Sequence, residues 1–348
     1  MNAVCAVAAS LTLLGCAQGL DPWPEGEAVG APGPPLGVAV QRASEYGWEA
    51  IQVLDVNADG LGDVFWRNPE RGLAATWLME GNRLLAPGPI LPCPLGGGWA
   101  ATTADFDGDG LADVLWNHVE QGLVAVELVE GVQPLALGPV IPGPGGGGWH
   151  TIPSDFNGDN MADVLWGHAG QGAMAIWLME GTRLLAPGPV IPGPPGDGWD
   201  VVSAGEFNVD GLADMVWAHG ESAQMAIWLM EGTRVLAPGP EIPGPLGDGW
   251  VFTWTDDFDA DGIEDVLWNH PEQNLMAVWL MEGTRVRVPG PEIPGPPGDG
   301  WRARTAGDVN GDDMADVVWQ RGDTMTVWLM EGTRVLAPGP LIPGPYGG

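Results

Sequence analysis

Asp105-Phe-Asp-Gly-Asp-Gly-Leu-Ala-Asp113-Val-Leu-Trp116 is one of six copies of a single pattern in this chain. Each copy places an oxygen-bearing side chain at its positions 1, 3, 5 and 9. Carboxylates that converge in a short loop repel one another unless a cation lies among them. Hard oxygen ligands suit Ca²⁺, which takes about 6–8 oxygens and tolerates irregular geometry. The pattern therefore predicts about six calcium sites, one in each of acidic loops 1 to 6.

The predicted ligands are the side chains at positions 1, 3, 5 and 9 and the backbone carbonyl at position 7. In chain order they are Asp55, Asn57, Asp59, Leu61 and Asp63; Asp105, Asp107, Asp109, Leu111 and Asp113; Asp155, Asn157, Asp159, Met161 and Asp163; Glu206, Asn208, Asp210, Leu212 and Asp214; Asp257, Asp259, Asp261, Ile263 and Asp265; Asp308, Asn310, Asp312, Met314 and Asp316. The alternative is a set of acidic hairpin turns that hold no metal.

An EF-hand is the nearest rival for such a loop, but it needs a bidentate Glu at position 12. Position 12 is Trp in all six copies, and an apolar β-type run precedes it. The loop is therefore expected to join two strands. Position 6 is Gly in four copies, which indicates a positive φ; Asn160 replaces it tolerably and Asp313 less comfortably.

The charge balance excludes several partners. The 348-residue chain carries a net charge of −34 with 12 Lys and Arg, so neither a nucleic acid nor an anionic membrane surface is an expected partner. The content of Gly (56) and Pro (34) is high enough to indicate disorder, but 19 Trp and a strict repeat argue for a packed core.

The N-terminus is typical of an exported protein. Residues 3–15 form an apolar run that is too short to span a bilayer, which predicts a signal peptide over residues 1–15. Its Leu-Leu-Gly-Cys16 ending resembles the bacterial lipobox, although no Lys or Arg precedes the run. Cys16 would then be lipidated, and the protein secreted or held at the surface as an outer-membrane lipoprotein through this anchor alone. The alternative is an ordinary signal peptide with a chance Cys.

The spacing between acidic loops is 50, 50, 51, 51 and 51 residues, which is typical of a propeller or a solenoid. Each repeat contains four strand-like segments: one after a Gly-Trp pair, one at Asp-Val-Leu-Trp, one like Met174–Met179 and one like Arg183–Val190. The Pro residues of the fourth segment place it at an outer edge. This pattern predicts an all-β protein, a β-propeller of four-stranded blades over residues 47–348.

Two local features refine this prediction. Glu180-Gly-Thr-Arg183 and its counterparts predict two-residue type II′ hairpins with a Glu–Arg pair across the strands. The first strand has seven residues from Trp to the first ligand in four repeats, but six in the second and third. The extra residue would reverse the side-chain faces unless a bulge or a looser loop absorbs it.

Residues 16–46 are expected to form a linker that contains part of a blade. Residues 25–36 echo residues 331–342, the second half of a repeat. Six complete blades are the first expectation, and seven with one incomplete blade are the second. The three repeated Trp series are interpreted as core between blades, with sugar stacking by one series as the alternative. His118, His168, His219 and His270 share one repeat position, where they end a strand at a turn or line a ligand-binding face.

The loop Asp-x-Asp/Asn-x-Asp-Gly-x-x-Asp, the Val-Leu-Trp strand after it and the Trp-Leu-Met-Glu-Gly segment together resemble bacterial FG-GAP/VCBS repeat proteins. The resemblance covers residues 47–348. It implies a Ca²⁺-stabilised β-propeller, as in integrin α-subunit heads and some lectins, with the metal ligands named above. Glu206 departs from the family's Asp, and its longer side chain is expected to weaken or reshape the fourth site.

The favoured function is a non-enzymatic binding or adhesion module at the cell surface, with a glycan or a surface protein as ligand. One alternative is a polysaccharide-acting enzyme, a lyase or glycosidase, although no catalytic motif is evident. Another is a structural component of a surface assembly.

Overall fold

A computed structural model describes residues 47–220 and 222–345. The predicted signal peptide, Cys16, the linker and the partial blade lie outside the described residues. Within the described part, the only helical element is the short 3-10 turn η1 (Ala169–Gln171). None of its helices is long and apolar enough to cross a membrane.

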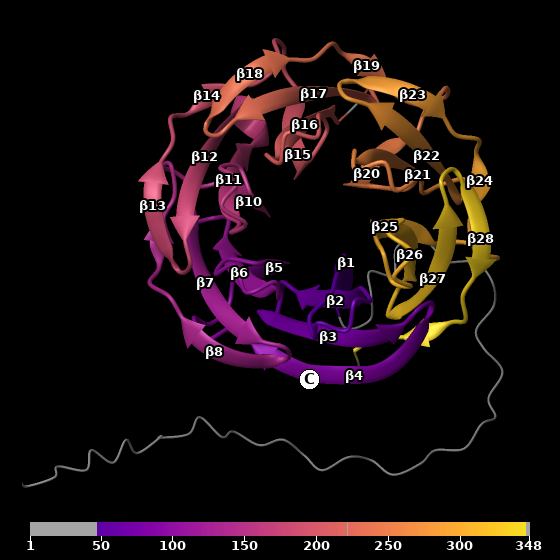
Figure 1. Cartoon of the computed structure of the whole chain (residues 1–348), viewed down its shortest axis with the longest axis horizontal. Helices are drawn as coiled ribbons and strands as arrows, with labels where there is room; N and C mark the ends of the chain where they lie inside the picture. Colours follow the sequence, from indigo (N-terminus) through magenta and orange to yellow (C-terminus); the bar gives the residue numbers. More distant parts are fainter. Residues whose placement is uncertain (1–46, 221, 346–348) are drawn as a thin grey trace, which may run out of the picture. The chain divides into compact units, whose positions relative to one another are not determined.

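The described residues form six blades arranged as a β-propeller, each a separate antiparallel sheet (Figure 1). Blade 1 contains β1 (Glu49–Leu54), β2 (Asp63–Asn68), β3 (Leu73–Glu80) and β4 (Arg83–Pro92); blade 2 contains β5 (Ala100–Ala104), β6 (Asp113–His118), β7 (Leu123–Glu130), β8 (Gln133–Leu137) and β9 (Ile141–Pro142); blade 3 contains β10 (His150–Ser154), β11 (Asp163–His168), β12 (Ala173–Glu180), β13 (Arg183–Pro187) and β14 (Ile191–Pro192). Blade 4 contains β15 (Trp199–Gly205), β16 (Asp214–His219), β17 (Gln224–Glu231), β18 (Arg234–Pro238) and β19 (Ile242–Pro243); blade 5 contains β20 (Val251–Asp256), β21 (Asp265–His270), β22 (Leu275–Glu282), β23 (Arg285–Pro289) and β24 (Ile293–Pro294); blade 6 contains β25 (Arg302–Gly307), β26 (Asp316–Arg321), β27 (Thr324–Glu331), β28 (Arg334–Pro338) and β29 (Ile342–Pro343). The prediction of six complete blades is confirmed.

Strand order within each blade follows the chain, with the first strand nearest the centre of the ring and the fourth at the rim (Figure 1). The prediction that the Pro-containing fourth strand is an outer edge is therefore confirmed. In blades 2 to 6 the chain then adds a short Ile-Pro strand, such as β14, which pairs with the third strand. Between the two segments, the Gly188 N–H still donates to the Ile176 carbonyl (2.9 Å), whereas the Pro that follows has no N–H to donate.

The second strand of every blade is almost entirely buried, and its Trp is fully enclosed, with 0% exposure. Hydrophobic clusters combine residues of adjacent blades, so these rings pack between blades as predicted. A Cβ on Gly193 would lie 2.4 Å from the Trp217 ring of the next blade. Members of all three Trp series are at most 9% exposed, which leaves them no open face for a sugar.

The register of the first strand also matches expectation. Blades 1, 4, 5 and 6, which have the extra residue, each show a bulge between the first and second strands. Blades 2 and 3, which lack the extra residue, pair without a shift. The bulges restore the inward and outward alternation of side chains before each acidic loop begins.

Among the described residues, no strand is exchanged between blades 6 and 1, and side-chain and loop contacts join the two blades. Gln320 accepts a hydrogen bond from the Ala50 N–H (3.1 Å) and donates one to the Trp48 carbonyl (2.8 Å). The Trp77 indole N–H donates to the Pro343 carbonyl (2.9 Å). Gln320 is therefore a main polar link across the closure.

We expect Gln320→Ala to destabilise the protein by about 1–3 kcal/mol, because it leaves buried backbone groups at the closure unpaired. Asn269→Ala is the matched control, because it changes the same position in blade 5. The side-chain amide oxygen of Asn269 has no hydrogen-bond partner among the described residues. Urea unfolding of both variants measures the difference. Equal losses would contradict a special role for Gln320.

Candidate functional site: acidic loops and the central channel

Position 1 of each acidic loop organises the backbone of that loop. In loop 3, Asp155 accepts hydrogen bonds from the backbone N–H groups of Asn157 (3.1 Å), Gly158 (2.7 Å) and Asn160 (2.8 Å). The longer Glu206 makes the equivalent contacts in loop 4, to the N–H groups of Asn208 (2.9 Å) and Gly211 (2.5 Å). The departure to Glu thus preserves the hydrogen bonds from positions 3 and 6 of the loop.

The backbone of these loops adopts left-handed conformations at two positions. Position 6 has positive φ as predicted, including Asn160 (63°) and Asp313 (65°). Position 4 also has positive φ, which the sequence did not reveal because Ala58 (61°) and Val209 (59°) are unusual there. A β-branched residue is disfavoured in this conformation, so Val209 places strain in loop 4.

The aspartate at position 9 is buried and links the loop to the third strand of its blade. Asp214 accepts hydrogen bonds from the Phe207 N–H (3.2 Å) in the loop and the Met230 N–H (2.7 Å) in β17. Both hydrogen bonds recur in the other five blades. This predicted ligand therefore has a structural role that needs no metal.

Burial raises the pKa of these position 9 carboxyl groups, although the two backbone hydrogen bonds oppose the shift and neighbouring loop carboxylates add to it. The pKa rises to about 6 at Asp63 and Asp113 and to about 7 at Asp163, Asp214, Asp265 and Asp316. At neutral pH the charged form is therefore costly, and a cation beside the loop would favour it.

Five of the six pairs of adjacent loops are joined by a backbone hydrogen bond, the exception being loops 1 and 2. The N–H at position 8 of one loop donates to the carbonyl at position 1 of the preceding loop, as from Ala213 to Asp155 (2.8 Å). The equivalent hydrogen bonds join Gly62 to Asp308, Ala162 to Asp105, Glu264 to Glu206 and Ala315 to Asp257. The geometry of each loop is therefore coupled to the contact between neighbouring blades.

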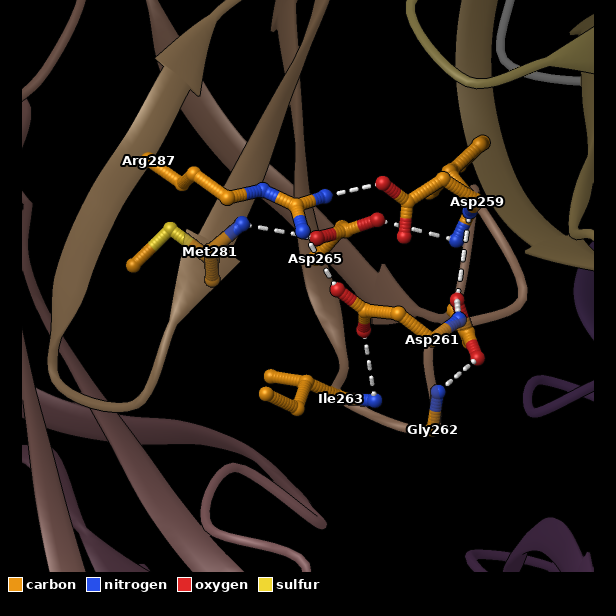
Figure 2. A network of polar contacts seen from close by, with 9 residues as sticks. Asp259, Asp261, Gly262, Ile263, Asp265, Met281 and Arg287 are labelled. Carbon is orange, nitrogen blue, oxygen red and sulfur yellow. Dashed lines mark hydrogen bonds and ion pairs between the residues drawn. The ribbon is translucent and has the colours of Figure 1, made fainter.

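Two loops bring their carboxylates closest together. Among the described residues, groups of three carboxylate oxygens within 4.8 Å occur in loop 2 (Asp105, Asp107 and Asp109) and loop 5 (Asp257, Asp259 and Asp265). An all-oxygen set of this kind fits a hard cation such as Ca²⁺. The position 7 residues are placed by donating their N–H to the position 5 carboxylate, as Leu111 does to Asp109 (2.8 Å). In loop 5 the guanidinium of Arg287 already faces the carboxylates (Figure 2).

A second feature is a cavity of about 470 Å³ at the centre of the ring, which we call the channel cavity. The first strands of all six blades line it. The bulge residues Ile51, Val202, Thr253 and Arg304 all face it, so the bulges direct additional side chains inward. Hydroxyl groups of Thr102, Thr151, Ser203 and Thr255 add polar lining.

Blade 5 contributes residues to the channel cavity that no other blade repeats. Trp254 is the one described Trp outside the three repeated series, and its counterparts are Gln52, Thr102, Ile152, Ser203 and Thr305. Asp256 and Glu264 line the same wall. Glu264 occupies position 8 of its loop, where the other loops have Gly or Ala. The sequence marks these three residues only by their departure from the repeat. They are not among the predicted site residues, because those predictions rest on the features that the repeats share.

The Glu264 carboxyl group packs against the backbone of Gly205 in blade 4. A Cβ on Gly205 of blade 4 would lie 2.0 Å from it, so this glycine is required for space. Glu264 Oε2 is buried and has no hydrogen-bond partner among the described residues. Burial raises the pKa of Glu264 to about 8, with a further contribution from the charge of Asp256, and burial raises the pKa of Asp256 to about 7.

Basic residues face the channel cavity from blades 1 and 6. Glu49 Oε2 lies 3.0 Å from Arg67 Nε, and Glu49 Oε1 lies 3.6 Å from Arg304 Nη2. Glu49 thus joins two cationic side chains at the wall. The cavity therefore contains carboxylates, guanidinium groups, hydroxyls and an indole, which together can hydrogen-bond and stack with a polar ring.

The four repeated histidines end the second strands of their blades, as one of the two interpretations predicted. Each packs edge-on against the Trp that precedes the first strand, as His118 does with Trp99 at 5.4 Å between ring centroids. Arg321 takes the same place over Trp301 in blade 6. These residues do not line the channel cavity.

Comparison with solved structures shows the fold. The chain is similar to AofleA from Arthrobotrys oligospora, with 11% identity, a TM-score of 0.51, and coverage of 87% of this chain and 90% of that chain. It is also similar to U3-55K, with 11% identity, a TM-score of 0.50 and coverage of 86% of each chain. At this identity the likeness concerns the fold alone. A comparison with curated protein sequences gave no match.

The family comparison is more specific. The model of the FG-GAP-like repeat matches residues 55–116, 155–217 and 257–319, which together make up more than half of the chain. Each matched segment begins at position 1 of an acidic loop and ends at the Trp at position 12 of the next. The acidic loops and the blades between them are thus what the family model recognises, and the chain belongs to the FG-GAP-like repeat family.

Proposed function

We propose that this protein is a calcium-stabilised, extracellular binding module that takes a small glycan into its channel cavity. The propeller fold and the family are consistent with a binding module. The observation that carries the proposal is the unrepeated group Trp254, Asp256 and Glu264 on one wall of the channel cavity. In a molecule built from near-identical blades, these three residues make one wall of the cavity chemically different from the rest.

The glycan class follows from the lining of the channel cavity. Sugars combine apolar ring faces with hydroxyl groups, so they suit an indole flanked by carboxylates, guanidinium groups and hydroxyls. The volume of about 470 Å³ falls in the range of small-molecule sites, which is about 300–1,000 Å³. A folded surface protein does not enter such a cavity and would bind elsewhere on the blades.

Calcium would be held by the side chains at positions 1, 3, 5 and 9 of the acidic loops, with loop 2 offering the closest group of carboxylates that no basic side chain contacts. The ion would neutralise the converging carboxylates and stabilise loops that already join neighbouring blades. Placement outside the cell is supported by the lipobox-like sequence that ends at Cys16.

The ligand is tested with a glycan array followed by titration calorimetry of the best glycan. Trp254→Thr introduces the residue found at this position in blades 2 and 6 and is expected to weaken binding at least tenfold, about 1.4 kcal/mol. Leu336→Ala, on the rim strand β28, is the control and should bind as wild type. If wild type and Trp254→Thr bind equally well, the channel cavity is not the site.

A polysaccharide-acting enzyme is the second candidate, favoured by the two carboxyl groups that share the channel cavity wall. A pair of carboxyl groups is the minimum set for acid–base cleavage of a glycosidic bond. Release of reducing ends from the glycans that bind, abolished in Asp256→Asn and Glu264→Gln, would establish this activity. Binding without product release in wild type would exclude it.

Burial of the position 9 carboxyl groups predicts that the stability of the protein depends on pH, and bound calcium should reduce this dependence. In EDTA, the position 9 carboxyl groups have folded-state pKa values of about 6–7, above the ordinary value of 3.8. The folded state therefore binds more protons than the unfolded state near pH 5–7, and the free energy of unfolding should fall as pH rises from 5 to 8. Excess Ca²⁺ should reduce this fall, because the ion favours the charged carboxylates, and at ten times Kd each site adds about 1.4 kcal/mol.

Thermal unfolding at pH 5, 6, 7 and 8, with EDTA and with Ca²⁺, checks both expectations. Asp163→Asn removes one titrating group and should reduce the slope in EDTA. A metal-free protein that is more stable at pH 8 than at pH 5 would contradict the role of burial. Melting temperatures that excess Ca²⁺ leaves unchanged would remove the case for a bound ion.

A further inference from the structure

The rim strand of blade 5 departs from the repeat at one position. β23 reads Arg285-Val-Arg-Val-Pro, and Arg287 stands where the other five blades have a leucine. These leucines are well exposed, between 52% and 65%, and have no evident packing role: Leu85, Leu135, Leu185, Leu236 and Leu336. The substitution therefore adds a cationic group at a solvent-facing position that the fold does not use elsewhere.

The Arg287 side chain extends from β23 to loop 5 of the same blade (Figure 2). Its Nη1 lies 2.7 Å from Asp261 Oδ2, and its Nη2 contacts Asp259 Oδ2. These two aspartates are positions 3 and 5 of the loop. The Arg287 side chain is 35% exposed, and its guanidinium lies against the two carboxylates.

Loop 2 provides a natural comparison, because loops 2 and 5 alone have Asp at positions 1, 3, 5 and 9. Both bring three carboxylate oxygens within 4.8 Å. In blade 2 the position of Arg287 is occupied by Leu135, which is 65% exposed. The two loops thus share their acidic residues and differ in whether the chain itself supplies a positive charge.

Loop 5 also has the most carboxyl groups in and beside it of the six loops. Asp256 and Glu264 flank it on the channel side, in addition to its four aspartates. The Arg287 guanidinium supplies a positive charge there through its contacts with Asp259 and Asp261. The guanidinium belongs to the same blade as the loop. Its effective concentration at the carboxylates is therefore high and does not depend on the calcium concentration of the solution.

We propose that Arg287 is the resident cation of loop 5, where it neutralises Asp259 and Asp261 and keeps this loop from binding calcium. Loop 5 then stays ordered when calcium is scarce, while loop 2 depends on the ion. This inference rests on the proposed calcium binding of the other loops. A divalent ion at loop 5 would have to displace two charge-assisted hydrogen bonds from their carboxylates.

The inference is tested by counting calcium ions per chain, using calorimetric titration of the full chain with CaCl₂. Arg287→Leu restores the residue of the other blades and should bind one more Ca²⁺ than wild type. Leu135→Arg places the guanidinium beside loop 2 and should bind one fewer. Leu236→Arg is the matched control: position 3 of loop 4 is Asn208, so the new arginine lacks the carboxylate pair and the count should not change.

Melting in EDTA gives an independent readout. Arg287→Leu should melt at least about 2 °C below wild type, since the loop 5 carboxylates lose their counter-charge, and Ca²⁺ should restore the loss. Leu135→Arg should melt at or above wild type in EDTA. Unchanged ion counts in both variants, or an Arg287→Leu protein that melts as wild type in EDTA, would overturn the inference.

These outcomes separate the two proposals. If wild type binds no Ca²⁺, the proposed calcium stabilisation fails, and Arg287→Leu must still lower the melting temperature in EDTA for Arg287 to remain the counter-charge of loop 5. If wild type binds Ca²⁺ and Arg287→Leu gains none, the calcium proposal stands and the role of Arg287 fails.

Discussion

The buried carboxylate at position 9 of each acidic loop is the interaction on which the rest of the structure depends. It holds one backbone N–H in the loop and one in the third strand, as Asp214 does with Phe207 and Met230. These hydrogen bonds fix the loop against the sheet that follows it. Backbone hydrogen bonds also join five of the six pairs of adjacent loops, so the loops that these carboxylates fix help to hold neighbouring blades together. The cost is charge that is buried beside other charge, which explains why the acidic loops are the natural place for a cation.

Much of the fold could be predicted from the sequence because each blade obeys local rules. The Pro-containing segment is an edge strand because Pro cannot donate to a ladder. The first strand has a bulge only where it has an extra residue, because side-chain alternation must be restored before the loop. Such rules act within a few residues, and six repetitions make each one visible.

The rest could not be predicted from the repeat, for physical reasons that concern single positions. The positive φ at position 4 is concealed by Ala58 and Val209, which tolerate it poorly. The contact between Glu264 and Gly205 joins two blades, and nothing in either segment alone indicates it. Arg287 meets loop 5 through the hairpin return of blade 5, a contact that depends on three-dimensional placement. The residues that distinguish one blade from another are therefore the ones that the shared pattern obscures.

Within residues 47–345, each blade consists of one contiguous stretch of chain, and the described strands of the first and last blades belong to separate sheets. A wheel of this kind tolerates circular permutation at its connectors, because relocating the termini divides no sheet. It also allows duplication or deletion of a gene segment to add or remove a whole blade, provided that the remaining blades can still pack into a closed ring.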